Sequence, residues 1–148
     1  AHSVGDTGRK DSIKVWGFWN ILGEEAFGRQ SEEEIRPWYW AWSLMCRYFP
    51  KGCDINAVEL TGSGELRACA AESDGRHTVA VVNWSSEDVQ ISMQVPYTFL
   101  NASVYVYEES GAYRDAEGSL VPSLTGICGD AVSVNVPAQS LTVITDMQ

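Results

Sequence analysis

Acidic side chains are the first residues to consider, because paired carboxylates can act as acid and as base or nucleophile on one bond. Such a pair holds its two carboxyl groups about 5 to 9 Å apart, with one kept protonated by its surroundings. Glu108 and Glu109 are adjacent at the end of a predicted strand, so their side chains leave on opposite faces. Glu24 and Glu25 fall in a predicted loop, and the run at 32–34 is typical of a solvated first helical turn. The sequence therefore predicts no catalytic residue in this chain.

The sequence also contains no motif for a catalytic nucleophile or for a metal site. The stretch "TGSGEL" at 61–66 is not a G-x-S-x-G nucleophile elbow, and it falls at a predicted turn between strands. His77 begins a predicted strand and has no acid or nucleophile near it in the sequence. We expect no metal site and no cofactor, since there are only two histidines and no C-x-x-C pair. Buried free thiols, with a single disulfide as the alternative, are expected for Cys46, Cys53, Cys69 and Cys128.

The net charge argues against nucleic acids as partners, and the length of the apolar stretches argues against a membrane. Ten Lys and Arg residues stand against twenty Asp and Glu residues, which gives a formal net charge of −10. That charge opposes the phosphate neutralisation that nucleic-acid binding requires. No stretch approaches the roughly 20 consecutive apolar residues of a membrane span. We therefore expect neither a nucleic acid nor a membrane as partner.

Aromatic side chains are the remaining candidates for binding, since an exposed ring can stack on the face of a sugar. Tyr105 and Tyr107 alternate along one predicted strand and share one face of it. The same pattern is typical of cross-strand packing, which is the interpretation we favour. Trp84 follows another predicted strand, where it either contacts a ligand or plugs the end of the fold. Neither pattern identifies a binding site by itself.

The elements that position these residues begin with a helix. "RPWYWAWSLMCRYFP" at 36–50 puts three tryptophans at alternate positions, as a strand would. Its large apolar residues, however, recur at i, i+4, i+7 and i+11, which predicts a helix over 37–49. Pro37 suits the first helical position, and Pro50 with Gly52 ends the helix. The predicted apolar stripe consists of Trp38, Trp42, Met45 and Phe49, flanked by Ala41 and Tyr48.

Trp40 lies off this stripe, on the side of the helix that also carries Ser43 and Arg47. Burying such a ring is worth roughly 1.5 to 3 kcal/mol, so a position in water would leave a large stabilising term unused. We therefore expect a second neighbour for the helix, either another part of the fold or a partner surface outside this chain. In the second case an exposed Trp40 would promote self-association.

After Gly52 the pattern changes to short alternating runs separated by turn residues, which predicts β-strands. Hairpin turns are expected at 62–64, 73–76, 85–88 and 109–113. Seven or eight strands at this spacing are typical of an antiparallel β-sandwich. We expect a mainly β fold of that kind, with one N-terminal helix packed at its edge.

The order of elements resembles the end of retaining glycoside hydrolases that combine a (β/α)8 barrel with a β-sandwich, such as β-xylosidases and glucuronoxylanases. "KVWGFWN" at 14–20 is similar to the eighth barrel strand, and "IRPWYWAWSLMCRYFPKGCDI" at 35–55 to the last barrel helix. "TVAVVNWSSEDVQISMQV" at 78–95 and "VPAQSLTVIT" at 136–145 are similar to strands of the sandwich. Together these stretches extend over most of the chain from residue 13 onward.

The resemblance implies a division into residues 1–52, a strand-loop-helix segment that ends the barrel, and residues 53–148, the sandwich domain. It implies that the catalytic carboxylates lie upstream, so the chain would be the non-catalytic C-terminal region of a glycoside hydrolase. The upstream catalytic barrel would be its partner, and it would have no activity alone. In such enzymes an aromatic residue at the end of the eighth strand often floors the sugar site, and Trp16 or Trp19 matches it here. The ligand of that residue would be an oligosaccharide.

Two other classes of protein compete with this interpretation. An independent carbohydrate-binding module would carry its own aromatic platform and would be stable as a monomer. An immunoglobulin-like interaction domain would place a core tryptophan between two cysteines, and Cys69, Trp84 and Cys128 occur in that order. Trp84 follows Cys69 too closely for that arrangement and the helix does not fit it, so we rank this class last.

Overall fold

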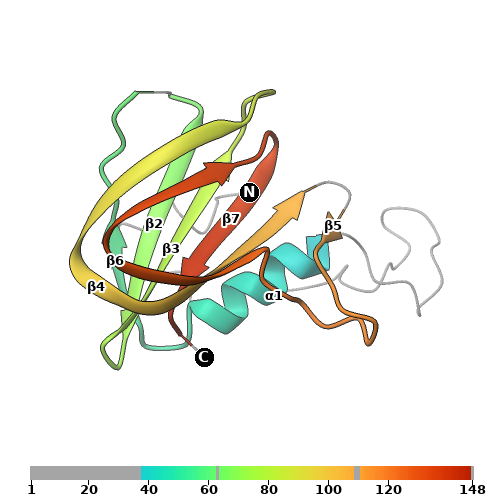
Figure 1. Cartoon of the computed structure of the whole chain (residues 1–148), viewed down its shortest axis with the longest axis horizontal. Coiled ribbons are helices and arrows are strands. Elements are labelled where there is room, and N and C mark those ends of the chain that lie inside the picture. The colour runs from blue at the N-terminus through green and yellow to red at the C-terminus, as the bar shows by residue number, and fades with distance from the viewer. Residues whose placement is uncertain (1–37, 63, 109–110, 148) are drawn as a thin grey trace.

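A computed structural model describes residues 38–62, 64–108 and 111–147. Over these residues the chain forms one α-helix and seven β-strands, and every strand pair is antiparallel, which confirms the predicted mainly β fold (Figure 1). The elements are α1 (Trp38–Tyr48), β1 (Asp54–Ala57), β2 (Leu66–Ser73), β3 (Arg76–Asn83), β4 (Val89–Glu108), β5 (Gly111–Ala112), β6 (Leu124–Val136) and β7 (Ser140–Thr145).

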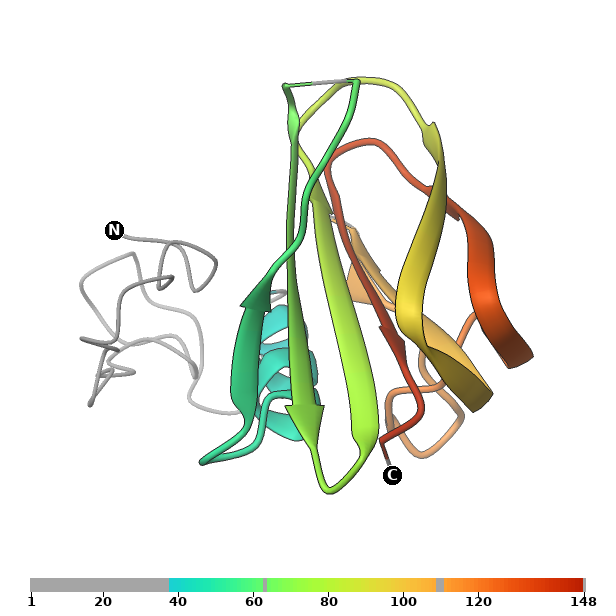
Figure 2. The same cartoon turned by 90° about the vertical axis from the view of Figure 1, so that its left-hand side faces the viewer.

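One continuous sheet folds over on itself to make the two layers of the sandwich. The larger layer has the strand order β1-β2-β3-β7-β4-β5, in which β4 takes part through its second half. The first half of β4 pairs with β6, and these two strands form the smaller layer over the inner face of the larger one (Figure 2). The register between β4 and β6 shifts three times between Gln94 and Val104. Such irregularities bend a strand, so this part of β4 is the corner that joins the layers.

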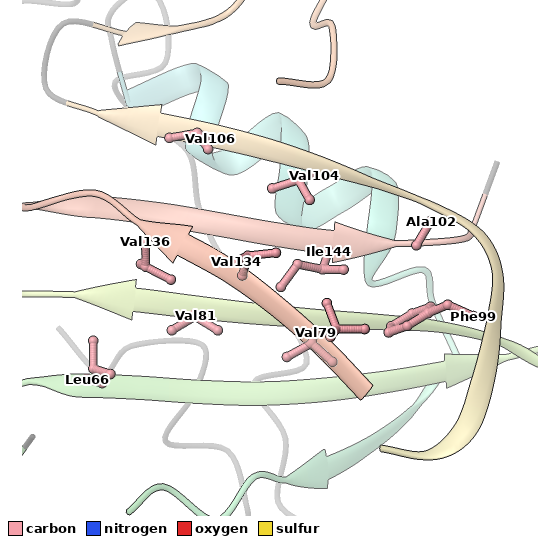
Figure 3. Packing of buried hydrophobic residues seen from close by; sticks show 11 residues of the cluster. Leu66, Val79, Val81, Phe99, Ala102, Val104, Val106, Val134, Val136 and Ile144 are labelled. Carbon is pink, nitrogen blue, oxygen red and sulfur yellow. The ribbon is translucent and has the colours of Figure 1, made fainter. Parts of the chain in front are cut away.

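Apolar side chains from both layers fill the space between them (Figure 3). Phe99 at the corner of β4 is fully buried, as are Val136 of β6 and Ile144 of β7. Every residue of β7 is buried, because the smaller layer covers one of its faces and α1 covers the other. Along β3, Val79 and Val81 join the core between the layers.

Helix α1 confirms the predicted helix, but it lies against the outer face of the larger layer and not at its edge. Leu44 and Tyr48 are buried there and pack with residues of β2, β3 and β7. Leu44 was not part of the predicted stripe, yet it is fully buried, whereas Trp42 is only partly buried. The buried side of the helix is therefore rotated from the predicted one. The residues packed between helix and sheet include Ala41, Met45, Phe49, Cys69, Ala80, Leu141 and Val143.

The turns differ in what they connect. Asp74 and Gly75 both have positive φ, +51° and +68°, which is the conformation of a two-residue type I′ hairpin, and they join β2 to β3 as predicted. The turn at 85–88 is not a hairpin, because β3 pairs with β2 and β7 and not with β4. That turn carries the chain from the larger layer to the smaller one.

Candidate functional site

The side of α1 turned away from Leu44 and Tyr48 carries aromatic and thiol side chains. Tyr39, Trp42 and Cys46 follow one another on this side at helical spacing. Cys46 is exposed, and the two rings are partly buried. We call these three residues the outer helix surface. A helix with large apolar side chains on opposite sides is typical of a position between two bodies.

Trp40 has a neighbour inside the chain. The guanidinium carbon of Arg114 lies 5.1 Å from the centroid of the Trp40 ring, which is within the range of a cation–π interaction. The ring of Tyr39 meets Trp40 edge-on, with the two centroids 5.1 Å apart. Trp40 is partly buried, so it is not the exposed ring that the self-association hypothesis assumed. The segment after β5 is thus a second neighbour of the helix, while self-association itself stays a prediction.

A tight turn positions Arg114. This residue forms an isolated bridge with Leu120, which packs in the same cluster as α1. The carboxylate of Asp115 accepts hydrogen bonds from the main-chain N–H groups of Glu117 and Ser119, at 3.1 and 2.7 Å. The backbone that follows Arg114 is thereby fixed, although the side chain is exposed.

Tyr105 and Tyr107 face the helix. The ring centroids of Tyr48 and Tyr105 are 5.0 Å apart, and Tyr107 packs against the same cluster. Burial, with Tyr105 adding to the effect, raises the pKa of Tyr48 well above its ordinary value. The packing interpretation is therefore confirmed: these rings hold α1 on the sheet and form no sugar platform.

Trp84 does not plug the end of the sandwich, because 62% of its surface is exposed. An exposed Trp84 also removes the core tryptophan that an immunoglobulin-like domain requires. The adjacent Asn83 is buried, and its Oδ1 accepts hydrogen bonds from the N–H and Oγ–H of Ser85, at 2.9 and 2.7 Å. The Asn83 amide nitrogen donates to the carbonyl oxygens of Glu87, Val136 and Pro137, at 2.8, 3.2 and 2.9 Å.

Gln139, just before β7, ties a second loop to this turn. Its main-chain N–H and its side-chain amide both donate to the carbonyl oxygen of Ser85, at 3.1 and 3.0 Å. The side-chain amide also donates to the carbonyl oxygen of Trp84. Gln139 has a φ of +51°, which is uncommon for a residue other than glycine, and these bonds hold it there. The backbone that presents the Trp84 ring is therefore fixed from two sides.

A polar cluster surrounds His77. Its imidazole stacks on the ring of Tyr97, with centroids 3.6 Å apart and an angle of 8° between the planes. Its Nε2 lies 3.9 Å from Oε2 of Glu72, and its main-chain N–H donates to the Asp146 carboxylate at 2.7 Å. The four residues come from β2, β3, β4 and the end of β7. No sequence motif could have brought them together, which is why His77 looked isolated in the sequence.

Tyr97 is not a base in this cluster. Burial, followed by the charges of Asp146 and Glu72, raises the pKa of Tyr97 to about 12, so its hydroxyl stays protonated at neutral pH. In the part of the chain that the structure describes, the Tyr97 hydroxyl and Nδ1 of His77 are buried without a hydrogen-bond partner. Buried polar atoms without partners are rare, so these two atoms require an explanation.

The four cysteines are free thiols, as predicted, but only Cys69 is buried. Cys46 and Cys128 are exposed, and Cys53 is partly buried. Burial raises the pKa of the Cys69 thiol to about 11 and also raises the pKa values of Cys46 and Cys53. A raised pKa leaves little thiolate at neutral pH, so these three side chains are weak nucleophiles.

Several predicted features lie outside the described residues. These include Trp16 and Trp19 and the carboxylates of Glu24 and Glu25, so the sugar contact of either tryptophan stays a prediction. Within residues 38–62, 64–108 and 111–147, no three His, Cys, Asp or Glu side chains are grouped to hold a metal ion. Helix α1, the helix of those ranges, is too short to cross a bilayer.

Comparison with other proteins gave matches at the level of structure. A search against protein-family models found no match, and neither did a search of curated protein sequences. The glycoside hydrolase family 30 endoxylanase from Clostridium papyrosolvens C71 matches with a TM-score of 0.64 and 13% identity, over 82% of this chain and 30% of its own. The family 30 subfamily 8 xylanase Xyn30A from Clostridium acetobutylicum matches with a TM-score of 0.62 and 14% identity, over 84% of this chain and 32% of its own.

Sequence identity at this level shows the fold alone. The chain spans less than a third of the length of either xylanase, 30% of one and 32% of the other. Each match extends over more than four fifths of this chain. The chain therefore shares its fold with a part of the xylanases of glycoside hydrolase family 30.

Proposed function

We propose that the chain is the non-catalytic C-terminal region of a glycoside hydrolase, in which the β-sandwich supports a catalytic (β/α)8 barrel located upstream. The observation that carries this proposal is the match of 82% of this chain to a xylanase of which it covers only 30%. The stretches at 14–20 and 35–55, which resemble the last strand and helix of such a barrel, support the same assignment.

The helix has a defined role in this proposal. Leu44 and Tyr48 bind α1 to the sandwich, while the outer helix surface of Tyr39, Trp42 and Cys46 meets the barrel. One helix would then belong to both bodies and fix their relative orientation. Catalysis would belong to the barrel, and Trp16 or Trp19 would contribute the floor of its sugar site.

The proposal is tested on the complete reading frame that encodes this chain. Its upstream part should encode alternating strands and helices, of about 250 residues for a whole barrel. The full-length protein should release reducing sugars from xylan or a related polysaccharide, whereas residues 1–148 alone should release none. Hydrolysis by residues 1–148 alone, or an upstream sequence without such repeats, would refute the proposal.

The role of the outer helix surface can be tested in the same full-length protein. Trp42→Ser should lower its melting temperature and its activity together, because both bodies lose a shared contact. Lys51→Ser, a substitution of an exposed residue just after α1, is the control and should change neither quantity.

A second candidate function is that of an independent carbohydrate-binding module, and the exposed Trp84 on its fixed loop favours it. Titration of residues 1–148 with xylo-, cello- and manno-oligosaccharides should then give a saturable change in tryptophan fluorescence with one sugar class. Trp84→Ala should abolish that change, while Leu124→Ala, another exposed apolar residue, should preserve it. No change with any of the sugars would exclude this function for Trp84.

A further inference from the structure

The outer face of the smaller layer is made by two regular strand segments. Residues 89–94 of β4 pair with residues 131–136 of β6 in an unbroken register, and the register shifts begin only after Gln94. Side chains alternate between the two faces of a strand, and those of Val132 and Val134 are buried in the core between the layers. The side chains between them therefore project away from the larger layer (Figure 2). The cross-strand pairs on this outer face, which we call the polar ladder, are Gln90–Asn135, Ser92–Ser133 and Gln94–Ala131.

The polar ladder carries no charge. All of its side chains are exposed, and apart from Ala131 they are amides and hydroxyls. Exposed positions of the larger layer are different, because they include the charged side chains of Asp54, Arg67, Glu72 and Arg76. The lack of charge is therefore a property of this face and not of the chain, whose 148 residues include 10 Lys and Arg and 20 Asp and Glu.

A shallow hollow of about 300 Å³ lies at one end of the polar ladder. Its lining includes Ser92, Gln94, Ala131 and Ser133. Ala131 has a much shorter side chain than Gln94, the residue across from it, so the pair leaves open space above β6. A group from outside the chain can enter this space and contact the amide of Gln94 on one side.

The hydrogen bonds within the polar ladder leave part of its capacity unused. Gln90 Nε2 donates to Ser133 Oγ at 3.0 Å, and Ser133 Oγ donates to the carbonyl oxygen of Ile91 at 3.2 Å. These bonds fix the Gln90 amide across the two strands. Within the described ranges, the carbonyl oxygen of that amide and the whole amide of Gln94 bond no other protein group. Since an amide both donates and accepts, the face offers donors and acceptors to a ligand.

These properties select one class of ligand. A sugar hydroxyl both donates and accepts hydrogen bonds, as amide and serine side chains do, and a neutral sugar is not repelled by the net charge of −10. A nucleic acid or another polyanion would be repelled. A protein partner would favour aromatic or arginine anchors, and the polar ladder contains neither.

We propose that the polar ladder binds a neutral, extended polysaccharide that runs along β4 and β6. Residues 90–94 span about 14 Å at the rise of a β-strand, so several successive sugar units contact the face. The inference rests on the proposed function, because the polysaccharide is the substrate of the parent enzyme. The polar ladder would hold a chain of that substrate on the sandwich while the barrel acts on it.

Trp84 lies near one end of this binding face. The Asp88 carboxylate accepts hydrogen bonds from the Asn135 amide at 3.2 Å and from the N–H of Ala138 at 2.9 Å. The turn that presents Trp84 therefore adjoins the Asn135 end of the polar ladder. An exposed ring there supplies a stacking surface for a sugar that extends beyond the ladder.

Nuclear magnetic resonance of residues 1–148 tests the proposal, because it locates a ligand on the chain. The protein should be titrated with xylohexaose, cellohexaose and mannohexaose, and main-chain and side-chain amide signals should be followed. At least one sugar should shift the signals of 90–94 and 131–135, and the side-chain amides of Gln90 and Gln94, in a saturable manner. The indole N–H of Trp84 is observed in the same spectra.

Variants of exposed residues make the test specific. Ser133→Glu puts a charge in the middle of the polar ladder and should weaken sugar binding at least about tenfold, since that charge loses water when the sugar binds. Thr125→Glu, the same charge at an exposed position of β6 outside the ladder, is the control and should leave the affinity unchanged. Gln94→Ala should weaken binding about two- to fivefold through the loss of one amide, and it replaces Ser133→Glu if that variant does not fold.

The parent enzyme gives a second measurement. Ser133→Glu should raise its KM for a soluble polysaccharide and leave its KM for a short oligosaccharide unchanged, because only the polymer reaches both the barrel and the polar ladder. Thr125→Glu should change neither KM. An equal rise of both KM values with Ser133→Glu would contradict the proposal, since it would show a general effect on the enzyme.

Three results of the titration would overturn the proposal. No shift with any sugar would mean that the face binds none of them. Shifts confined to Trp84 and its turn would mean that a sugar binds there without the polar ladder. Ladder shifts that follow protein concentration and not sugar would mean that a second copy of the chain covers the face. Failure of the proposed function would show differently, as a parent protein that contains no barrel or hydrolyses no glycoside, whatever the titration gives.

Discussion

Among single residues, Asn83 joins two loops through hydrogen bonds of its side chain. Its side chain bonds the turn between β3 and β4 to the end of β6 and to the segment before β7. An asparagine amide can donate two hydrogens and accept two, so one residue satisfies several backbone groups at once.

Asn83→Ala should therefore lower the free energy of unfolding by about 2 to 4 kcal/mol, since it removes the acceptor of the Ser85 N–H and the donor that the carbonyl oxygens of Glu87, Val136 and Pro137 share. Urea denaturation followed by fluorescence measures this loss. Asn135→Ala is the control, because Asn135 is exposed and bonds only a side chain, Asp88, at 3.2 Å. Its loss should stay within about 0.5 kcal/mol, and equal losses in the two variants would contradict the role assigned to Asn83.

Tyr97 predicts a pH dependence at the alkaline end. Its pKa is about 12 in the folded chain, against an ordinary value of about 10 in the unfolded chain. The unfolded state therefore loses the proton first, so the stabilising contribution of the neutral phenol is complete below about pH 10 and is lost as the pH rises toward 12. Tyr97→Phe should flatten the decline of unfolding free energy in this window. Tyr113→Phe, a change to an exposed ring, should leave the decline as steep as in the unmodified chain.

Among the secondary-structure elements, α1 depends both on its own sequence and on its contact with the sheet. The spacing of its apolar residues predicts a helix, and the sheet decides which side of it is buried. Leu44 has no exposed surface and lies at the centre of the contact with β3 and β7. The sequence pattern placed Trp42 on the buried side and left Leu44 out, because large rings dominate any count of apolar side chains.

Leu44→Ala should cost about 2 to 5 kcal/mol of unfolding free energy, the range for deleting a fully buried leucine side chain. Chemical denaturation of residues 1–148 measures it. Arg47→Ala, on the exposed side of the same helix, should cost less than about 1 kcal/mol even though its guanidinium lies over the Tyr48 ring. A loss at Arg47 as large as that at Leu44 would show that the burial of α1 has been assigned to the wrong side.

Elements with a local cause could be predicted from the sequence, and contacts between distant segments could not. The Asp74–Gly75 turn, the helix and the alternating strands each depend on neighbouring residues. The sequence predicts short strands after Gly52, yet residues 89–108 form one long bent strand, because its corner depends on packing around Phe99. The cluster around His77 was missed for the same reason, since four strands contribute to it.

For the molecule as a whole, a second buried cluster on the outer face of the larger layer joins α1 to the sandwich. The face of the larger layer under the helix contains Ala80, Leu141 and Val143, all buried. Without α1 these residues would contact water. A boundary at residue 53, where the sequence pattern changes, therefore separates an element from the surface that it covers.

Residues 53–148 expressed alone should be less stable than residues 1–148, by more than about 3 kcal/mol for the lost burial of Leu44 and Tyr48. They should also bind a hydrophobic dye through the uncovered face of the sheet. Thermal unfolding and dye fluorescence of the two proteins test this. Equal melting temperatures and equal dye binding would show that α1 contributes nothing to the sandwich.

The bonding of Asn83 also affects how the protein can be produced. Asn83-Trp84-Ser85 has the form of an N-glycosylation acceptor, but the amide nitrogen that would receive the glycan is buried and bonded to three carbonyl oxygens. In a eukaryotic secretory pathway a glycan could be attached only before the turn closes, and it would then keep the turn open. Asn101-Ala102-Ser103 carries no such conflict, since Asn101 is exposed. Secretion from such a host would set glycosylation of Asn83 in competition with folding, and a bacterial host would avoid that competition.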